Sequence, residues 1–518
     1  MIRLAVMSVC ALLALGLPPA WAETRALVVG VDKYYYIQPL KGAVNDARDI
    51  HAALEKLDVR DRTLLLNGKA TKAAIRKAWF AMVERANPGD LLIFTYAGHG
   101  GQEPENVKGT EKDGKDENFI LAGFNGKSRS GRKERIVDNE IHAWLKAASD
   151  RKLKVVFVAD SCHSGTMTRA LDRRFSLPSR DTPPYAIPDD LPVPEESKKG
   201  ARISQDQLPG VLFLAATQEH RKTPEVLING RPRGALSYVF ARILEGAADN
   251  NHDRVTTLFE LEDYLRAMVR TYSQARQTPE VIPHGEDRPV LRVNAAAPAA
   301  IMDDDEAAPL KVAVMGMPLD AAARILERIP GAELAGPGVE NPALVWDVKE
   351  KVIANGTGDI VARDVFEHQL PGVVAKWRAL ASLQEMAGQS PLEMRMLPDD
   401  SVHRRGEVVT FKSAPLRYPY VTVFNLAWDG QVQYLYPLRN DPDGHFTGRP
   451  WKISLKVTPP YGSDHLVLIA SEKLPAALRA RLRDIRDPAR LAPLLRKTLK
   501  DNPHQSGIQP LFTAPGDG

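Results

Sequence analysis

Two side chains of this sequence have the chemistry for nucleophilic catalysis, Cys162 and His99. A thiolate attacks a carbonyl carbon while an imidazole takes up and returns the proton. Each residue follows a short apolar run, 155–159 or 91–96, that ends in small and polar residues. Such runs predict strands buried on both faces of a parallel sheet. Because ligands bind at the carboxyl ends of such strands, we expect His99 and Cys162 to face each other across one crevice.

Acyl transfer also needs hydrogen-bond donors for the oxyanion that develops on the attacked carbonyl. Glycines flank His99 in the stretch Gly98-His99-Gly100-Gly101, so backbone N–H groups can approach a substrate there without obstruction. We assign the donors to the amides of Gly100 and Cys162.

The first 22 residues have the pattern of a secretory signal peptide: Arg3, an apolar stretch over 4–17, and Ala20-Trp21-Ala22 as a cleavage site. We therefore expect an exported protein, periplasmic or secreted. Removal of this segment takes away Cys10 and leaves Cys162 as the only cysteine. A disulfide within the mature chain is then impossible. An intermolecular bridge, a reactive thiol and an inert buried cysteine remain, and the strand-end position favours the reactive thiol.

The chain has 518 residues and a formal net charge of +4, too small to indicate a nucleic-acid partner. Beyond the signal peptide no stretch is long and apolar enough to predict a membrane span. Apolar runs alternate with amphipathic helices as far as residue 271, which predicts βαβ units around a mostly parallel sheet flanked by helices. We expect strands at 24–30, 63–66, 91–96, 155–159 and 211–216, and helices at 45–57, 71–85, 139–148, 235–245 and 258–271.

Composition divides the chain further. The stretch 166–209 is basic, proline-rich and without apolar periodicity, which indicates a flexible loop. We expect an α/β domain over 23–294, a linker over 295–309, a small α/β region over 310–395, a sandwich-like β domain over 396–480, and a C-terminal helix and frayed tail over 481–518.

The motifs Tyr96-Ala-Gly-His99-Gly100 and Asp160-Ser-Cys162-His-Ser-Gly165 resemble those of caspase-like cysteine peptidases, in particular the metacaspase and bacterial orthocaspase branch. The resemblance extends from Leu27 to about Pro283. It implies a caspase-like fold, His99 as the general acid and base, Cys162 as the nucleophile, and peptides or proteins as substrates. The β domain resembles one found behind bacterial caspase-like domains, and its company there suggests a protein or envelope partner.

In this family Asp46 and Asp160 match acidic residues of the pocket that holds the side chain before the cleaved bond. Two carboxylates there imply cleavage after Arg or Lys, because opposite charges retain a cationic side chain. A carboxylate at Asp46 also suits a helix N-terminus, and both readings can hold together.

No organic cofactor is implied. The resemblance suggests one ion, calcium, because members of this family bind it with acidic loops near the position of residues 111–117. Glu111, Asp113, Asp116 and Glu117 supply such a loop, with Asp113, Asp116 and Glu117 as ligands. Arg169 stands where another acidic ligand is expected. A solvated charged turn is the alternative.

The basic loop also offers sites for self-cleavage, with Arg169, Arg174 and Arg180 as candidates; a lid or passive linker is the alternative. Two rival functions remain open. One is a catalytically weak scaffold that binds envelope partners through its C-terminal domains. The other is a peptidase with a preference for Asp.

Overall fold

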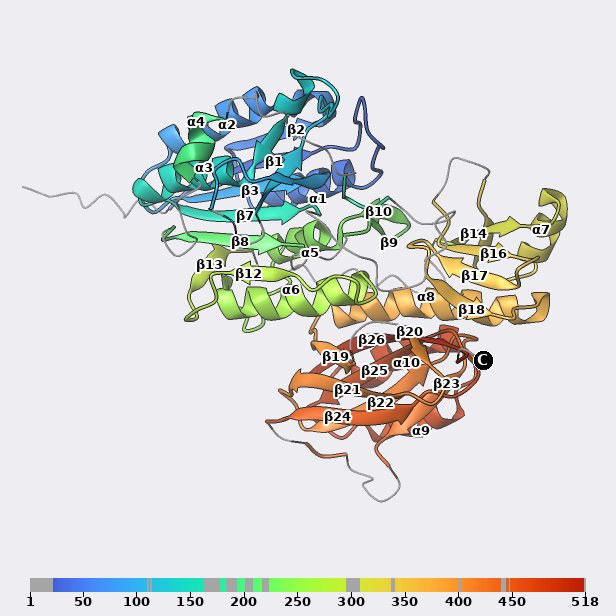
Figure 1. Cartoon of the computed structure of the whole chain (residues 1–518). Coiled ribbons are helices and arrows are strands. Elements are labelled where there is room, and N and C mark those ends of the chain that lie inside the picture. Colours follow the sequence, from blue (N-terminus) through green and yellow to red (C-terminus); the bar gives the residue numbers. More distant parts are fainter. Residues whose placement is uncertain are drawn as a thin grey trace, which may run out of the picture.

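A computed structural model describes residues 22–109, 111, 114–162, 178–182, 193–200, 208–216, 223–294, 308–336, 341–398, 402–438, 444–446 and 448–516. Figure 1 shows three parts: the peptidase-like part in blue to green, a small α/β unit in yellow, and a β-rich part in orange to red. All of the predicted signal peptide except Ala22, most of the 166–209 loop and most of the 295–309 linker lie outside the described residues.

The peptidase-like part is built on one six-stranded sheet with the order β12-β8-β7-β3-β1-β2. Five of these strands, β1, β2, β3, β7 and β8, run parallel to one another, and β12 is antiparallel to β8. Their apolar runs are buried because helices cover both faces. The expected α/β fold is confirmed. The strands are β1 (Thr24–Gly30), β2 (Arg62–Leu66), β3 (Leu91–Ala97), β7 (Lys154–Asp160), β8 (Val211–Ala215) and β12 (Glu280–Ile282).

Amphipathic helices pack on the two faces of this sheet, close to where the sequence predicts them. On one face lie α1 (Ala43–Lys56), α5 (Ala235–Leu244) and α6 (Leu258–Tyr272). On the other lie α2 (Lys72–Arg85) and α3 (Asp138–Asp150), with the short α4 (Glu195–Gly200) against α3. Thr71 caps α2 by accepting a hydrogen bond of 3.2 Å from the amide of Ala74, which fixes where that helix begins.

Several short strands outside the central sheet were not expected from the sequence. They form an antiparallel sheet of β4 (Gly100–Pro104), β5 (Lys115–Ile120) and β6 (Arg135–Val137), a hairpin of β9 (Val226–Ile228) and β10 (Arg231–Arg233), and a pair of β11 (Val255–Thr257) and β13 (Pro289–Arg292). Single-turn 3₁₀ helices follow β2 (Asn67–Lys69) and precede β6 (Gly131–Lys133).

The yellow part of Figure 1, which we call the accessory unit, is a five-stranded sheet with the order β15-β14-β16-β17-β18 and one helix. The long helix α8 follows it and packs against both this unit and the β-rich part, so the two share one buried helix. The elements are β14 (Leu310–Met315), α7 (Leu319–Leu326), β15 (Ala332–Leu334), β16 (Leu344–Asp347), β17 (Val352–Asn355), β18 (Ile360–Arg363), a 3₁₀ turn (Glu367–Gln369) and α8 (Leu370–Ala387).

The β-rich part consists of a five-stranded sheet, β20-β26-β25-β22-β23, and a three-stranded sheet, β19-β21-β24. The two sheets share a core of apolar side chains, and α9 and α10 pack on the larger one. The elements are β19 (Met394–Leu397), β20 (Val402–Arg404), β21 (Val408–Pro415), β22 (Tyr420–Leu426), β23 (Val432–Tyr436), β24 (Pro450–Lys456), β25 (Ser463–Ser471), α9 (Ala476–Asp484), a 3₁₀ turn (Pro488–Arg490), α10 (Leu491–Leu499) and β26 (His504–Ala514).

The expected frayed tail at the C-terminus is wrong. β26 runs antiparallel to β25 from His504 to Phe512 and is mostly buried. The sequence did not predict this strand, because the apolar alternation that marks a strand is weak in Gln505-Ser506-Gly507-Ile508-Gln509.

Among the described residues, no helix is long and apolar enough to cross a membrane.

Candidate active site

The predicted pairing of the two strand ends is present. β3 and β7 are hydrogen-bonded parallel neighbours, and Ala97 at the end of β3 lies in register with Asp160 at the end of β7. His99 and Cys162 each follow two residues later, so the sheet brings the imidazole and the thiol to the same edge. Both are buried, with 2% and 0% of their surfaces exposed.

His99 is held in one orientation. Its Nε2 lies 2.8 Å from the carbonyl oxygen of Gln38, and its ring packs on Tyr34 with centroids 4.7 Å apart. Because a carbonyl only accepts, Nε2 carries the proton and Nδ1 is the basic nitrogen. Nδ1 is buried and has no hydrogen-bond partner. Burial lowers the pKa of His99, so the ring is neutral and able to accept a proton.

Cys162 has no direct contact with water. The amide of Thr223 points at its Sγ, and Ser179 Oγ lies 3.9 Å away. Burial raises the pKa of the Cys162 thiol to about 11, and the nearby Asp181 carboxylate raises it further. In this state Cys162 is therefore a protonated, covered thiol.

The cover is a piece of the chain itself, residues 178–182, which we call the cleft segment. Its backbone is antiparallel to residues 223–225: the Arg180 amide donates to the Thr223 carbonyl at 3.0 Å, and the Glu225 amide donates to the Pro178 carbonyl at 3.0 Å. On the other side, the Thr182 amide donates to the Gly100 carbonyl at 3.0 Å. The cleft segment thus crosses the strand ends in an extended conformation.

The carbonyl oxygen of Arg180 accepts hydrogen bonds from the amides of Gly100, at 2.9 Å, and Cys162, at 3.3 Å. These are the two donors that the sequence predicts for an oxyanion. The Arg180 carbonyl group therefore lies where these two donors would hold the oxygen of a scissile carbonyl.

The side chain of Arg180 is fully buried among the carboxylates of Asp46, Asp160 and Glu225, which we call the arginine pocket. Nη1 lies 3.0 Å from Asp160 Oδ1, and Nη2 contacts Asp46 and lies 3.3 Å from Glu225 Oε1. Asp46 and Asp160 are thus together, as the sequence predicts. Burial raises the pKa of Asp46 well above its usual value, while the neighbouring guanidinium opposes that rise.

Backbone amides hold the three carboxylates independently of Arg180. Gly234 donates to both oxygens of Asp46 at 3.0 Å, and Ser237 donates to Asp160 at 2.9 Å. The amides of Lys41 and Gly42 donate to Glu225 at 2.9 and 2.7 Å. The arginine pocket is therefore preorganised for a cation.

Gly234 leaves room for the guanidinium. A Cβ at this position would lie 2.1 Å from Asp160 Oδ2 and 2.5 Å from Arg180 Nη1. Any other residue would therefore fill the space that a cationic side chain needs.

Three residues of the site were not predicted from the sequence: Glu225, Gln38 and Thr223. Glu225 lies directly after Lys222-Thr223-Pro224 and before an apolar run, without a recognisable motif, so no local signal marks it. Of the three self-cleavage candidates, Arg169 and Arg174 lie outside the described residues.

The predicted calcium ligands are only partly described. Asp113 lies outside the described residues, and Glu117 is partly buried on β5. Asp116 is fully buried, and its oxygens accept hydrogen bonds from Asn106 and Asn139, a donor set that an ion would have to displace. Within the described ranges, no group of three or more His, Cys, Asp or Glu residues is arranged to hold a metal ion.

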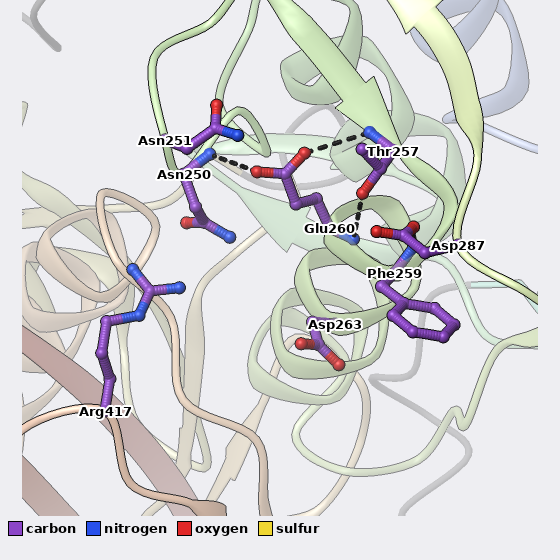
Figure 2. Close-up of a pocket in the computed structure, with 8 residues that line it drawn as sticks. All are labelled: Asn250, Asn251, Thr257, Phe259, Glu260, Asp263, Asp287 and Arg417. Carbon is purple, nitrogen blue, oxygen red and sulfur yellow. Dashed lines mark hydrogen bonds between the residues drawn. The ribbon is translucent and has the colours of Figure 1, made fainter.

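A separate pocket of about 400 Å³ lies at the beginning of α6 (Figure 2). Glu260 accepts hydrogen bonds there from the amides of Asn250, at 3.1 Å, and Thr257, at 3.0 Å, so its carboxylate closes the first turn of the helix. The pocket contains neither His99 nor Cys162, and we assign it no part in the chemistry.

Comparisons with known proteins bear on the peptidase-like part. Residues 24–171 match the model of the family described as "Metacaspase, peptidase C14 domain". Metacaspase-1 of Pyricularia oryzae is 32% identical over 153 residues, covering 28% of this chain and 37% of the relative. Metacaspase-1 of Coccidioides immitis is 25% identical over 295 residues, covering 49% and 61%. Metacaspase-1 of Arabidopsis thaliana is 31% identical over 160 residues, covering 29% and 42%.

This chain thus spans less than two thirds of the length of each of these relatives. Among solved structures, caspase-1 of Spodoptera frugiperda is similar with a TM-score of 0.30 and 11% identity, covering 50% of this chain and 86% of that one. A protein from Geobacter sulfurreducens is similar with a TM-score of 0.35 and 19% identity, covering 50% and 92%.

Proposed function

Because residues 24–171 belong to the metacaspase family of caspase-like cysteine peptidases, we propose that this protein is an active endopeptidase that cleaves after Arg or Lys with His99 and Cys162 as its catalytic pair. One observation carries the proposal. Arg180 of the chain lies in the cleft as a substrate would, with its guanidinium in the arginine pocket and its carbonyl on the two predicted oxyanion donors.

The chemistry follows from these positions. His99 Nδ1 takes the thiol proton as Cys162 Sγ forms a bond to the substrate carbonyl carbon, and the amides of Gly100 and Cys162 stabilise the negative oxygen. The peptide C–N bond then breaks, and the proton passes from His99 to the leaving amine. Water attacks the thioester with the same residue as base, which releases the new carboxylate and restores the thiol.

Within the Arg/Lys class, the arrangement favours arginine. A guanidinium is a planar fork whose two ends reach Asp160 on one side and Asp46 with Glu225 on the other. A lysine ammonium is a single point and cannot engage both ends at once. We expect kcat/KM for arginine peptides to exceed that for matched lysine peptides by about tenfold. An aspartate side chain would meet three carboxylates, which disfavours the alternative Asp preference.

We infer that Arg180–Asp181 is the first bond the enzyme cuts. In the intact chain the cleft segment excludes other substrates and leaves the Cys162 thiol covered. Cutting after Arg180 leaves a new N-terminus at Asp181, and both free ends can then leave the cleft.

The test uses purified full-length protein and its Cys162→Ala variant with fluorogenic peptides ending in Arg, Lys or Asp, followed by intact-mass analysis. We expect turnover of the Arg peptide and a mass step at Arg180, both absent in the variant. Cleavage only after Arg169 or Arg174 would contradict the Arg180 assignment. No turnover of any peptide and no chain cleavage would favour the scaffold function instead, with the C-terminal parts binding an envelope partner.

Calcium activation is a further proposal, resting on the acidic loop of Asp113, Asp116 and Glu117. We would titrate calcium into the peptidase assay with Asp116→Asn and, as a comparison, Asp253→Asn in the loop before α6, where Asp249, Asn251, Asp253 and Glu260 have the spacing of calcium-binding loops. Loss of calcium dependence only in Asp116→Asn would support the proposed ligands. Loss only in Asp253→Asn, or no dependence in the parent, would contradict them.

Export to the periplasm or beyond is proposed from the first 22 residues. Fractionation of cells followed by N-terminal sequencing should find the mature chain outside the cytoplasm and beginning at Glu23. A chain that retains Met1 would contradict it.

A further inference from the structure

The cleft segment shows in which direction a substrate lies. Arg180 pairs with Thr223 and Pro178 pairs with Glu225, and the two stretches are antiparallel. If the cleaved arginine is counted as the first residue and counting proceeds toward the substrate's N-terminus, the third residue lies opposite Glu225. In the same register the fifth lies opposite Leu227, in the middle of β9.

β9 has one edge turned toward that path. Its pairing with β10 joins Val226 to Arg233 and Ile228 to Arg231 across a two-residue turn. In an antiparallel ladder, successive residues direct their N–H and C=O groups to opposite edges of the strand. The backbone of Leu227, like that of Glu225, therefore faces the edge on which the cleft segment pairs. Leu227 and Glu225 also share one side-chain face, since the period of a strand is two residues.

The accessory unit lies against this face. A Cβ placed on Gly356 would be 3.1 Å from Leu227 Cδ1 and 3.2 Å from the carbonyl oxygen of Pro342. Lys41, whose amide holds Glu225, donates from Nζ to Asn341 Oδ1 at 2.7 Å. Figure 1 shows the β9–β10 hairpin between the peptidase-like part and the strands of the accessory unit.

A buried ion pair fixes the unit in this place. Arg276, just after α6, contacts Asp359 with Nε 3.1 Å from Oδ2, and the Asp359 side chain is 1% exposed. Removing either partner would leave a buried charge unpaired, so the contact is a firm one.

We propose that the accessory unit forms the far end of the substrate groove and binds the substrate's fifth residue and those beyond it. This proposal rests on the proposed function. The occupant is an extended peptide segment that adds as a strand to the edge of β9, the mode in which main-chain hydrogen bonds give affinity and alternate side chains give specificity. The fifth side chain points to the face of Leu227, Pro342 and Gly356. We therefore expect an apolar side chain in this place of the substrate.

The test compares three arginine peptides with a fluorogenic leaving group: one of three residues, one of six with Leu in fifth place, and one of six with Asp there. The enzyme is the full-length chain after the Arg180–Asp181 cut, or Arg180→Gln if no cut occurs. We expect kcat/KM for the Leu peptide to be about tenfold that of the three-residue peptide, through KM, because an apolar side chain becomes buried. The Asp peptide should show no such gain.

The matched variant is Gly356→Asp, which places a carboxylate at the fifth-residue position. It should bring the ratio between the Leu and three-residue peptides close to one, and its turnover of the three-residue peptide reports that the enzyme is folded. Leu227→Ala, a smaller change, should lower the same ratio in part. Equal kcat/KM for the Leu and Asp peptides, or a ratio unchanged in both variants, would overturn the proposal. A three-residue peptide that is not cleaved at all would instead overturn the proposed function.

Discussion

Arg180 in the peptidase-like part and Lys376 in the C-terminal region are both completely buried cations, and their surroundings differ. Arg180 belongs to a short extended segment and meets three carboxylates that backbone amides hold in place without it. Lys376 stands in the middle of α8 and donates to the backbone carbonyl of Ser463, with the carboxylates of Asp464 and Asp429 nearby.

The difference separates a binding site from a structural contact. A site whose acidic groups have their own hydrogen bonds can release its cation and take another. Lys376 cannot leave without unfolding its helix, and burial lowers its pKa to about 7. The first arrangement predicts effects on activity, whereas the second predicts effects on stability alone.

The largest expected effect is on the nucleophile. Cys162→Ala should lower kcat for an arginine peptide by a factor on the order of 10⁴ or more, because the thiolate is the group that forms the acyl intermediate. Stopped-assay kinetics would measure it, with the thermal midpoint as the control for folding. Residual activity within tenfold of the parent would exclude Cys162 as the nucleophile.

The next effect is on the reactivity of the Cys162 thiol, which release of the cleft segment should raise. At pH 7.5 a thiol with a pKa of about 11 is almost wholly protonated, whereas an exposed one has a pKa of about 8.5. Alkylation of Cys162 by iodoacetamide should therefore be about 100-fold faster in the cut chain or in Arg180→Gln than in the intact chain.

In the intact chain the alkylation rate should keep rising up to about pH 11. Cys162 is the only cysteine after Cys10, so the intact mass of a chain that begins at Glu23 reports this site alone. Equal rates in both forms would show that the segment does not protect the thiol.

The arginine pocket should respond in proportion to each carboxylate's contact with the guanidinium. Asp160→Asn should lower kcat/KM for arginine peptides by about 100-fold, and Glu225→Gln by about tenfold, since removing one partner of a buried ion pair is costly. The exposed Asp58→Asn is the matched control and should change nothing. If Glu225→Gln leaves the Arg-to-Lys ratio unchanged, the third carboxylate has no part in selectivity.

The smallest effect on activity is expected at Lys376, where a substitution should change stability instead. Its folded pKa of about 7 lies below the unfolded value of about 10.4, so between these pH values the unfolded chain binds more protons, and stability rises with pH. Below pH 7 the burial cost is present in full. Lys376→Met should therefore stabilise the protein by about 3 kcal/mol at pH 6, with a gain that shrinks toward pH 10.

Urea unfolding at the two pH values measures this gain, and peptidase activity should stay at the parent level. A gain independent of pH would show that the amine is not desolvated in the folded state.

Much of the peptidase-like part could be predicted because its signals are local. The apolar runs before His99 and Cys162 mark buried parallel strands, and parallel strands end at one edge, so the two residues had to meet there. The polar strand β26 was not predicted, because the signal for it is not local. Its burial comes from pairing with β25 and covering helices, and its own sequence carries little apolar alternation.

The sequence by itself determined the type of sheet, the chemistry at its edge and two of the three acidic groups of the arginine pocket. Only the tertiary structure decided that Glu225 joins them and that Arg180, among several basic residues of its loop, lies between them. These contacts join residues 20 to 134 positions apart. No pattern of neighbouring residues encodes such a distance, because it depends on how strands, helices and loops close around one another.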